Sequence, residues 1–183
     1  MKKIIVAVLI IFPTVAFSQV LVKAGGALGN RWTETLNSQT LGKGLRLSGE
    51  KFLVQHFSIG AGISYFSFNP NKLINVSFNS YSLQCTYYFN TKKLHPYLGA
   101  GVGYTWYKDE TTIDLGNSNT DMQTRDKDYG VISPYVGLQY GIYKKRQTGF
   151  FIQVNTDFVP IANIQPIGFI SIAAGVSYHL PGH

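Results

Sequence analysis

The chain has 183 residues, of which 45% are hydrophobic and 14% are charged, with 19 Gly, 12 Tyr and 12 Phe. This length suits one domain, and low charge combined with many aromatic residues excludes an intrinsically disordered chain. The net charge of +7 is spread over turns and forms no stripe, so we expect no nucleic-acid partner. Beyond the first dozen residues, no apolar run approaches the roughly 20 residues of a membrane-spanning helix.

The first 18 residues have the pattern of an export signal. A positive start at Lys2 and Lys3 precedes an apolar run over residues 4–12, and Ala16-Phe17-Ser18 places small residues before a cleavage point. We therefore expect residues 1–18 to be a cleaved signal peptide and residues 19–183 to form the mature domain.

Residues 96–108, PYLGAGVGYTWYK, alternate with a period of two, which indicates a β-strand with two different faces. One face is apolar and ends in two aromatic residues, whereas the other is almost bare: Gly99, Gly101, Gly103 and Thr105. Small residues suit a crowded interior. We therefore interpret the apolar face as the lipid-facing outside of a closed barrel and the small polar face as its inside.

The same alternation recurs along the chain and predicts eight strands, at about residues 20–29, 42–51, 57–68, 81–89, 96–108, 135–142, 150–158 and 170–180. Asn69-Pro70-Asn71 has the composition of a turn. Val76 and Phe78 have the opposite parity to the rest of the fourth strand, which predicts a bulge or a later start. Pro134 cannot donate to a ladder, so we expect regular pairing to begin after it or to bulge there.

Strands of this length can cross a bilayer when tilted, and backbone groups cannot remain unpaired in lipid, so the sheet must close. Connections after the second, fourth and sixth strands are short and basic, which is typical of the periplasmic side, and the others are mostly longer, which is typical of the exterior. Aromatic residues near the strand ends predict two girdles, formed by Tyr87, Phe89, Tyr140, Phe150 and Tyr178 on one side and by Tyr65, Tyr104, Trp106 and Phe158 on the other.

The GAGVGY run after Pro96-Tyr97, the FSIGAGISY segment and the alternating last strand resemble the small outer-membrane β-barrel family. That family includes the OmpA transmembrane domain and OmpX-like proteins among the porin-type outer-membrane proteins. The resemblance implies an all-β, eight-stranded antiparallel up-and-down transmembrane β-barrel over residues 19–183, in the outer membrane of a Gram-negative bacterium. It also implies contact with outer-membrane lipids and lipopolysaccharide, and insertion by the barrel-assembly machinery.

Four ionisable side chains fall on the inward face of the predicted barrel: Lys23, Arg46, Glu50 and Asp157. Eight strands leave a lumen about wide enough for side chains to fill. Because an unpaired charge in a poorly hydrated interior is costly, the two bases and two acids should pair. We interpret them as a structural network that plugs the lumen, and the alternative is a gate or a narrow ion path.

We expect no catalytic residue, no metal site and no cofactor. His56-Phe57-Ser58 superficially resembles the pairing of barrel enzymes that act on lipid A, but no acid is placed to orient the histidine. Residues 109–128 contain six of the nine acids, yet bases lie among them and no EF-hand pattern is present, so a solvated surface loop is expected. Cys85, the single cysteine, lies on an apolar face as a small hydrophobe.

These observations favour an integral outer-membrane barrel with a structural or surface-interaction role and an unknown extracellular partner. A channel or transporter for small solutes or hydrophobic ligands is the first alternative, and a lipid A-modifying enzyme is the second. A secreted soluble barrel such as a lipocalin would have the inverted pattern, with the apolar residues inside.

Overall fold

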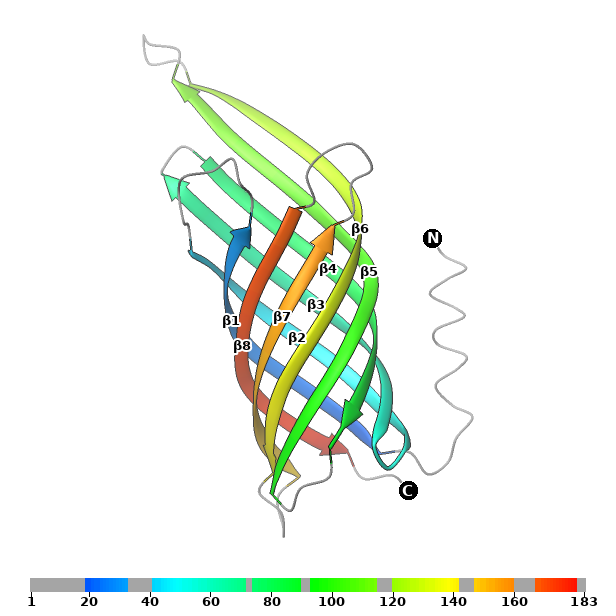
Figure 1. The fold of residues 1–183 in the computed structure, drawn as a ribbon. Coiled ribbons are helices and arrows are strands. Elements are labelled where there is room, and N and C mark those ends of the chain that lie inside the picture. The colour runs from blue at the N-terminus through cyan, green and yellow to red at the C-terminus, as the bar shows by residue number, and fades with distance from the viewer. Residues whose placement is uncertain are drawn as a thin grey trace.

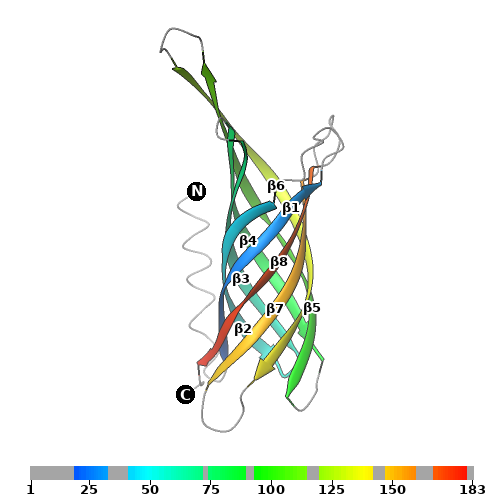
Figure 2. The ribbon, with the colours of Figure 1, turned by 90° about the vertical axis from the view of Figure 1, so that its left-hand side faces the viewer.

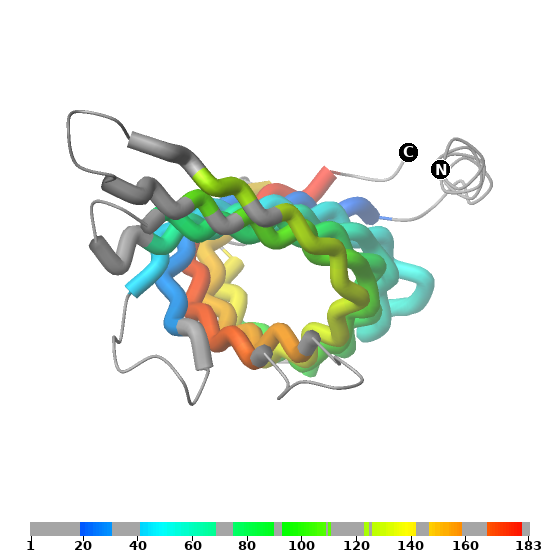
Figure 3. The backbone as a smooth tube through the Cα atoms, turned by 90° about the horizontal axis from the view of Figure 1, so that it is seen from above, coloured from blue at the N-terminus to red at the C-terminus, as the bar shows by residue number. Residues whose placement is uncertain are grey.

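A computed structural model describes residues 19–32, 41–71, 74–89, 93–114, 120–141, 147–159 and 167–180. The predicted signal peptide and the basic turn at residues 144–146 lie outside these ranges. The described chain forms a closed barrel in which each strand pairs antiparallel with the next and β1 pairs with β8 (Figure 1, Figure 3). The strands are β1 Val20–Trp32, β2 Leu41–Val54, β3 Phe57–Asn71, β4 Ile74–Tyr88, β5 Leu94–Asp114, β6 Thr120–Gly141, β7 Thr148–Val159 and β8 Ile167–Leu180.

The two rims of the barrel differ. Val20 pairs with Leu180, so the first and last strands begin and end on the same rim. That rim, which we call the inner rim, also carries the tight turn at Gln55-His56 between β2 and β3. At the opposite, outer rim, the β5–β6 hairpin rises well beyond the other strands (Figure 1, Figure 2). Contrary to the prediction, the outer connections are not uniformly longer than the inner ones: β3 ends at Asn71 and β4 begins at Ile74 at the outer rim, whereas β6 ends at Gly141 and β7 begins at Thr148 at the inner rim.

The outside of the barrel is apolar, as the alternation predicts. Leu98 is 47% exposed, Val102 60%, Leu138 41% and Ile172 51%, and all four point away from the lumen. All nine aromatic residues of the two predicted girdles are likewise exposed. Exposure of an apolar band around the whole barrel is unfavourable in water, whereas contact of the same band with the hydrocarbon of a bilayer is favourable. The chain is therefore an eight-stranded transmembrane β-barrel. Within the described residues, no helix has the length and the apolar character needed to cross a membrane.

The fourth strand corrects one expectation. β4 starts at Ile74 and pairs with β5 in one unbroken register to Tyr88, without a bulge or a late start. Val76 and Phe78 are buried and share the inward parity of Gln84 and Thr86. The parity seemed to change because the outer half of the lumen is lined by apolar side chains, so an inward-facing residue there is not polar.

The acidic segment at residues 109–128 corrects another expectation, because it is mostly strand. β5 continues to Asp114 and β6 begins at Thr120, and the two strands stay in register throughout. Lys108 lies opposite Asp126 in the ladder, and opposite charges in such a cross-strand pair stabilise a sheet. Above the membrane both faces of a hairpin meet water, so no apolar alternation marks these strands.

Two prolines also lie inside strands. β3 runs through Asn69-Pro70 to Asn71, where a turn was expected, and its pairing with β4 shifts register between Phe68 and Asn71. Pro134 lies within β6 and pairs with Ala100 of β5. On the β7 side, the pairs Ile132–Phe158 and Tyr135–Asn155 keep the same register, and the two positions between them make no pair. Pro134 therefore interrupts pairing on one side of β6 without a bulge.

Candidate functional site in the barrel lumen

The charged centre of the lumen is an ion pair between β1 and β2. Lys23 Nζ lies 2.7 Å from Glu50 Oε1, and both side chains are only 2% exposed. The strand register explains the contact: Glu50 lies opposite Leu21, and Lys23 lies opposite Ser48, so the two side chains are diagonal neighbours on the inward face. Inward-facing positions alternate with lipid-facing ones, and this alternation places both charges inside.

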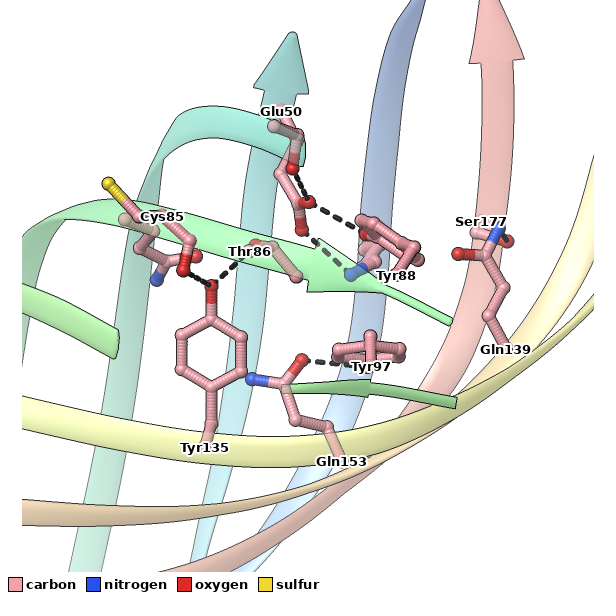
Figure 4. Close-up of polar contacts among 12 residues, drawn as sticks. Glu50, Cys85, Thr86, Tyr88, Tyr97, Tyr135, Gln139, Gln153 and Ser177 are labelled. Atoms are coloured by element: carbon pink, nitrogen blue, oxygen red, sulfur yellow. Dashed lines mark hydrogen bonds and ion pairs between the residues drawn. The ribbon is translucent and has the colours of Figure 1, made fainter. Parts of the chain in front are cut away.

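The second oxygen of Glu50 accepts two further hydrogen bonds. Ser58 Oγ donates to Glu50 Oε2 at 2.7 Å, and the Tyr88 hydroxyl donates to the same oxygen at 2.7 Å (Figure 4). The Lys23 ammonium also lies 4.0 Å from the centre of the Tyr97 ring, within the range of a cation–π contact. A buried ion pair offsets its desolvation only when its remaining donors and acceptors are satisfied, and this carboxylate meets that condition.

Polar contacts continue across the lumen to the strands opposite. The Tyr97 hydroxyl donates to Gln153 Oε1 at 2.8 Å, and the Tyr135 hydroxyl shares a 2.6 Å hydrogen bond with Thr86 (Figure 4). Each bond joins two strands that are separated by one other strand, β5 with β7 and β4 with β6. Tyrosine hydroxyls thus cross-link next-but-one strands inside the barrel.

Of the four predicted interior charges, the structure brings Lys23 and Glu50 together and leaves the other two apart. Arg46 and Asp157 are both buried, but Arg46 stacks over the Tyr135 ring, 6.0 Å from its centre. Asp157 interacts with the Ser133 hydroxyl and, more distantly, with the charge of Arg46. Lys23–Glu50 and Lys108–Glu110 form ion pairs within the described residues. The expected four-member network is therefore one tight pair and two separate charges.

An aromatic cluster in the outer half of the lumen was missed by the sequence analysis. Its rings make close edge-to-face contacts; Phe66 and Phe169, for example, have centroids 4.5 Å apart. The cluster consists of Phe66, Phe68, Val76, Phe78, Phe151, Phe169, Ala27 and Ala173, with Tyr107 packed against it. The signal was present, since Phe66 and Phe68 share the parity of the inward Ser64. Because the sequence analysis expects small or polar side chains at inward positions, it does not identify aromatic residues there.

Glycines make room for the inward rings. A Cβ added at Gly137 would overlap the Tyr97 ring, and one added at Gly99 would overlap the Tyr135 ring. Both glycines are the direct cross-strand partners of those tyrosines. The same relation recurs in the outer half of the lumen between Gly44 and Phe66. These three inward glycines therefore leave the space that an aromatic ring from the neighbouring strand occupies.

The histidine and serine considered for lipid chemistry have other partners. His56 Nδ1 lies 3.1 Å from the Tyr88 carbonyl oxygen, whereas the Ser58 hydroxyl is directed to Glu50 inside the barrel. Cys85 is a free cysteine whose side chain is exposed on the lipid-facing surface. The part of the chain that the structure describes contains no cluster of three or more His, Cys, Asp or Glu side chains able to hold a metal ion.

The projecting hairpin carries its own charge contacts, outside the membrane. Lys108 forms an ion pair with Glu110, which also accepts a 3.3 Å hydrogen bond from Asn75 of β4. The hydrogen bond with Lys108 lowers the pKa of Glu110, and the same contact raises the pKa of Lys108. Both groups are therefore charged at neutral pH.

The fold and the lumen together define a class, the small eight-stranded outer-membrane β-barrels. No protein-family model matches the chain, and no curated protein matches its sequence. Among solved structures, Neisserial surface protein A matches with a TM-score of 0.65 and 16% identity, over 87% of this chain and 96% of that chain. Ail, the attachment invasion locus protein of Yersinia pestis, matches with a TM-score of 0.58 and 15% identity, over 90% and 99%.

The outer membrane enzyme PagL has the same fold, with a TM-score of 0.52 and 15% identity, over 87% of this chain and 99% of that chain. At these identities the likeness concerns the fold alone. Since one barrel architecture carries surface proteins and an enzyme, function has to be argued from the residues of this chain.

Proposed function

We propose that this protein is an integral outer-membrane barrel of a Gram-negative bacterium, with a lumen closed by its own side chains and a structural or surface-interaction role. The lipid-facing band would contact outer-membrane lipids and lipopolysaccharide. The last strand, which ends in alternating Tyr178 and Leu180, would present the signal for the barrel-assembly machinery. Two fold neighbours carry names of surface or attachment proteins, and this analogy is compatible with the proposed role.

The observation that carries the proposal is the filling of the lumen. In the inner half, the Lys23–Glu50 pair is enclosed by Leu21, Tyr88 and Tyr97. In the outer half, the aromatic cluster is packed ring against ring. Water and ions would have to cross first an apolar layer and then a tightly bonded charged layer, so a closed lumen is favoured over a steady conducting path.

Planar-bilayer recording tests the closed lumen. We expect the folded protein to give no steady conductance. A variant that combines Lys23→Ala/Glu50→Ala with Phe66→Ala/Phe169→Ala should give brief openings, because both layers that close the lumen then lose bulk and contacts. Lys108→Ala/Glu110→Ala is the matched control, since that pair lies in the projecting hairpin outside the lumen. Steady conductance of the unaltered protein would instead support the alternative, a channel for small solutes.

A further inference from the structure

Two inward-facing histidines lie at the inner rim of the barrel. His95 is the second residue of β5, and His179 is the last residue but one of β8. Successive strand residues point to opposite faces, so His95 has the inward direction of the buried Tyr97, and His179 has that of the buried Ser177. Both histidines are partly buried. They therefore line the mouth of the lumen, where ions on the inner side of the membrane can reach them.

Gln139 of β6 lies between the two histidines. It is the direct cross-strand partner of His95, which places their Cβ atoms about 4.5–5.5 Å apart. Gln139 also reaches β8, where its Nε2 lies 3.2 Å from His179 Nε2 and donates a 3.2 Å hydrogen bond to Ser177 Oγ (Figure 4). The two histidines interact electrostatically with each other. They therefore approach the same amide, one from the β5 side and one from the β8 side.

The surroundings of His179 hold its ring in place and are compatible with a bound cation. Phe52 stacks against the ring, with centroids 6.2 Å apart and an interplanar angle of 20°. Lys23 and Glu50 also act electrostatically on His179, but their charges are opposite and are joined in the 2.7 Å ion pair. A cation at the mouth would therefore meet little net charge from this pair.

We propose that His95 and His179 bind a Zn²⁺ ion at the inner mouth of the barrel, with the Gln139 amide oxygen as a third ligand once the amide rotates. Imidazole nitrogen is a ligand that suits Zn²⁺, and water would complete the usual four-coordinate shell. Within the described residues no three His, Cys, Asp or Glu side chains cluster to hold a metal ion, so the site is open to water rather than closed by protein ligands. No metal site is expected from the sequence alone, because only closure of the barrel brings the two histidines to one amide. The bound ion would join β5 to β8, and this inference is independent of the proposed surface-interaction role.

Zinc titration of the full-length protein in lipid nanodiscs tests the proposal. The probe is ZnCl₂, measured by isothermal titration calorimetry, and we expect a single ion per barrel. His95→Ala and His179→Ala should each weaken binding by more than about tenfold, because loss of a residue that merely supports a metal ligand already costs about 10- to 100-fold. His56→Ala is the matched control, since this imidazole lies at the same rim but its Nδ1 lies 3.1 Å from the Tyr88 carbonyl oxygen. MgCl₂ should not bind at this site, because Mg²⁺ prefers oxygen ligands.

Two further measurements report on the site without a comparison of affinities. A ligand that binds only the folded state stabilises it, so excess Zn²⁺ should raise the urea midpoint of the unaltered protein but not that of the His95→Ala/His179→Ala variant. Cu²⁺ also takes imidazole ligands, and electron paramagnetic resonance of bound Cu²⁺ should show coupling to the nitrogen nuclei of both histidines in the unaltered protein. Heat-modifiable migration on gels checks that each variant is folded.

Three results would overturn the inference. The first is no binding of Zn²⁺ to the unaltered protein. The second is equal Zn²⁺ affinity of the unaltered protein and either the His95→Ala or the His179→Ala variant, which would place the ion elsewhere. The third is an equal loss of affinity in His56→Ala, which would move the site away from Gln139. In each case His179 would be a structural residue that packs against Phe52. None of these results bears on the conductance test, so the closed barrel can stand when the zinc site fails.

Discussion

At the scale of single residues, the buried polar groups of the lumen are of two kinds. Some have hydrogen-bond partners and others have none among the described residues. Glu50 receives three donors, from Lys23, Ser58 and Tyr88. By contrast, Ser171 Oγ and Asn155 Nδ2 are buried without a hydrogen-bond partner among the described residues. A buried polar group without a hydrogen-bond partner lowers the free energy of unfolding, whereas a hydrogen bond to a charged group raises it.

Two buried serines provide a matched comparison. Ser58→Ala removes a donor to the Glu50 carboxylate, so we expect the free energy of unfolding to fall by about 1.5–3 kcal/mol. Ser171→Ala removes a hydroxyl that has no partner, and we expect a change within about 0.5 kcal/mol or a small gain. Urea titration of the protein in lipid vesicles measures both values. Equal losses in the two variants would contradict the hydrogen-bond assignment around Glu50.

At the scale of the strand, inward rings and glycines are matched across neighbouring strands. Tyr97 of β5 is the direct cross-strand partner of Gly137 of β6, and Tyr135 of β6 is the direct partner of Gly99 of β5. Each strand therefore places one ring over a glycine of the other. Outward glycines have no such role, because a Cβ added at Gly49 has nothing within 4 Å. At these positions the absence of a side chain, which leaves space for a ring, matters more than the conformational freedom of glycine.

This relation predicts different outcomes for the same substitution. At Gly137, an alanine Cβ would overlap the Tyr97 ring and would lie 2.7 Å from the Ile152 carbonyl oxygen, so we expect Gly137→Ala to lower the free energy of unfolding by about 1–3 kcal/mol. Gly49→Ala should change it by less than about 0.5 kcal/mol. A tolerated Gly137→Ala, with unchanged tyrosine fluorescence and urea midpoint, would show that the ring does not need the glycine.

At the scale of the whole molecule, the surrounding solvent decides which face must be apolar. Val102 is 60% exposed in the middle of the apolar band. If this surface faced water, a charged residue at so exposed a position would hardly change the free energy of unfolding. In a bilayer, the same charge would have to enter hydrocarbon.

We therefore expect Val102→Arg to destabilise the barrel in lipid vesicles by about 2–4 kcal/mol, the cost of an arginine near the bilayer midplane. Thr124→Arg, on the projecting hairpin, should have little effect because that residue is exposed to water. Unfolding by urea in vesicles measures both variants. Equal stability of Val102→Arg and the unaltered protein would remove the membrane assignment.

The sequence by itself determined the barrel, the number of strands and the inward or outward direction of most side chains. It could do so because a strand with lipid on one side and a crowded lumen on the other must alternate with a period of two. The prediction was wrong where that contrast is inverted or disappears. Around Val76 and Phe78 the inward face of β4 is apolar and the outward positions are Asn75, Ser77 and Asn79. Above the membrane both faces of the β5–β6 hairpin meet water.

Only the tertiary structure decided which interior groups meet. Lys23, Arg46, Glu50 and Asp157 could be placed inside from their parity, but closure and register bring Lys23 to Glu50 and leave Arg46 over Tyr135. The point at which β6 begins to pair with β7 likewise depends on where β7 ends relative to its neighbour. Parity is a local property of each strand, whereas contacts across a lumen depend on the stagger of all eight strands, which alternation does not encode.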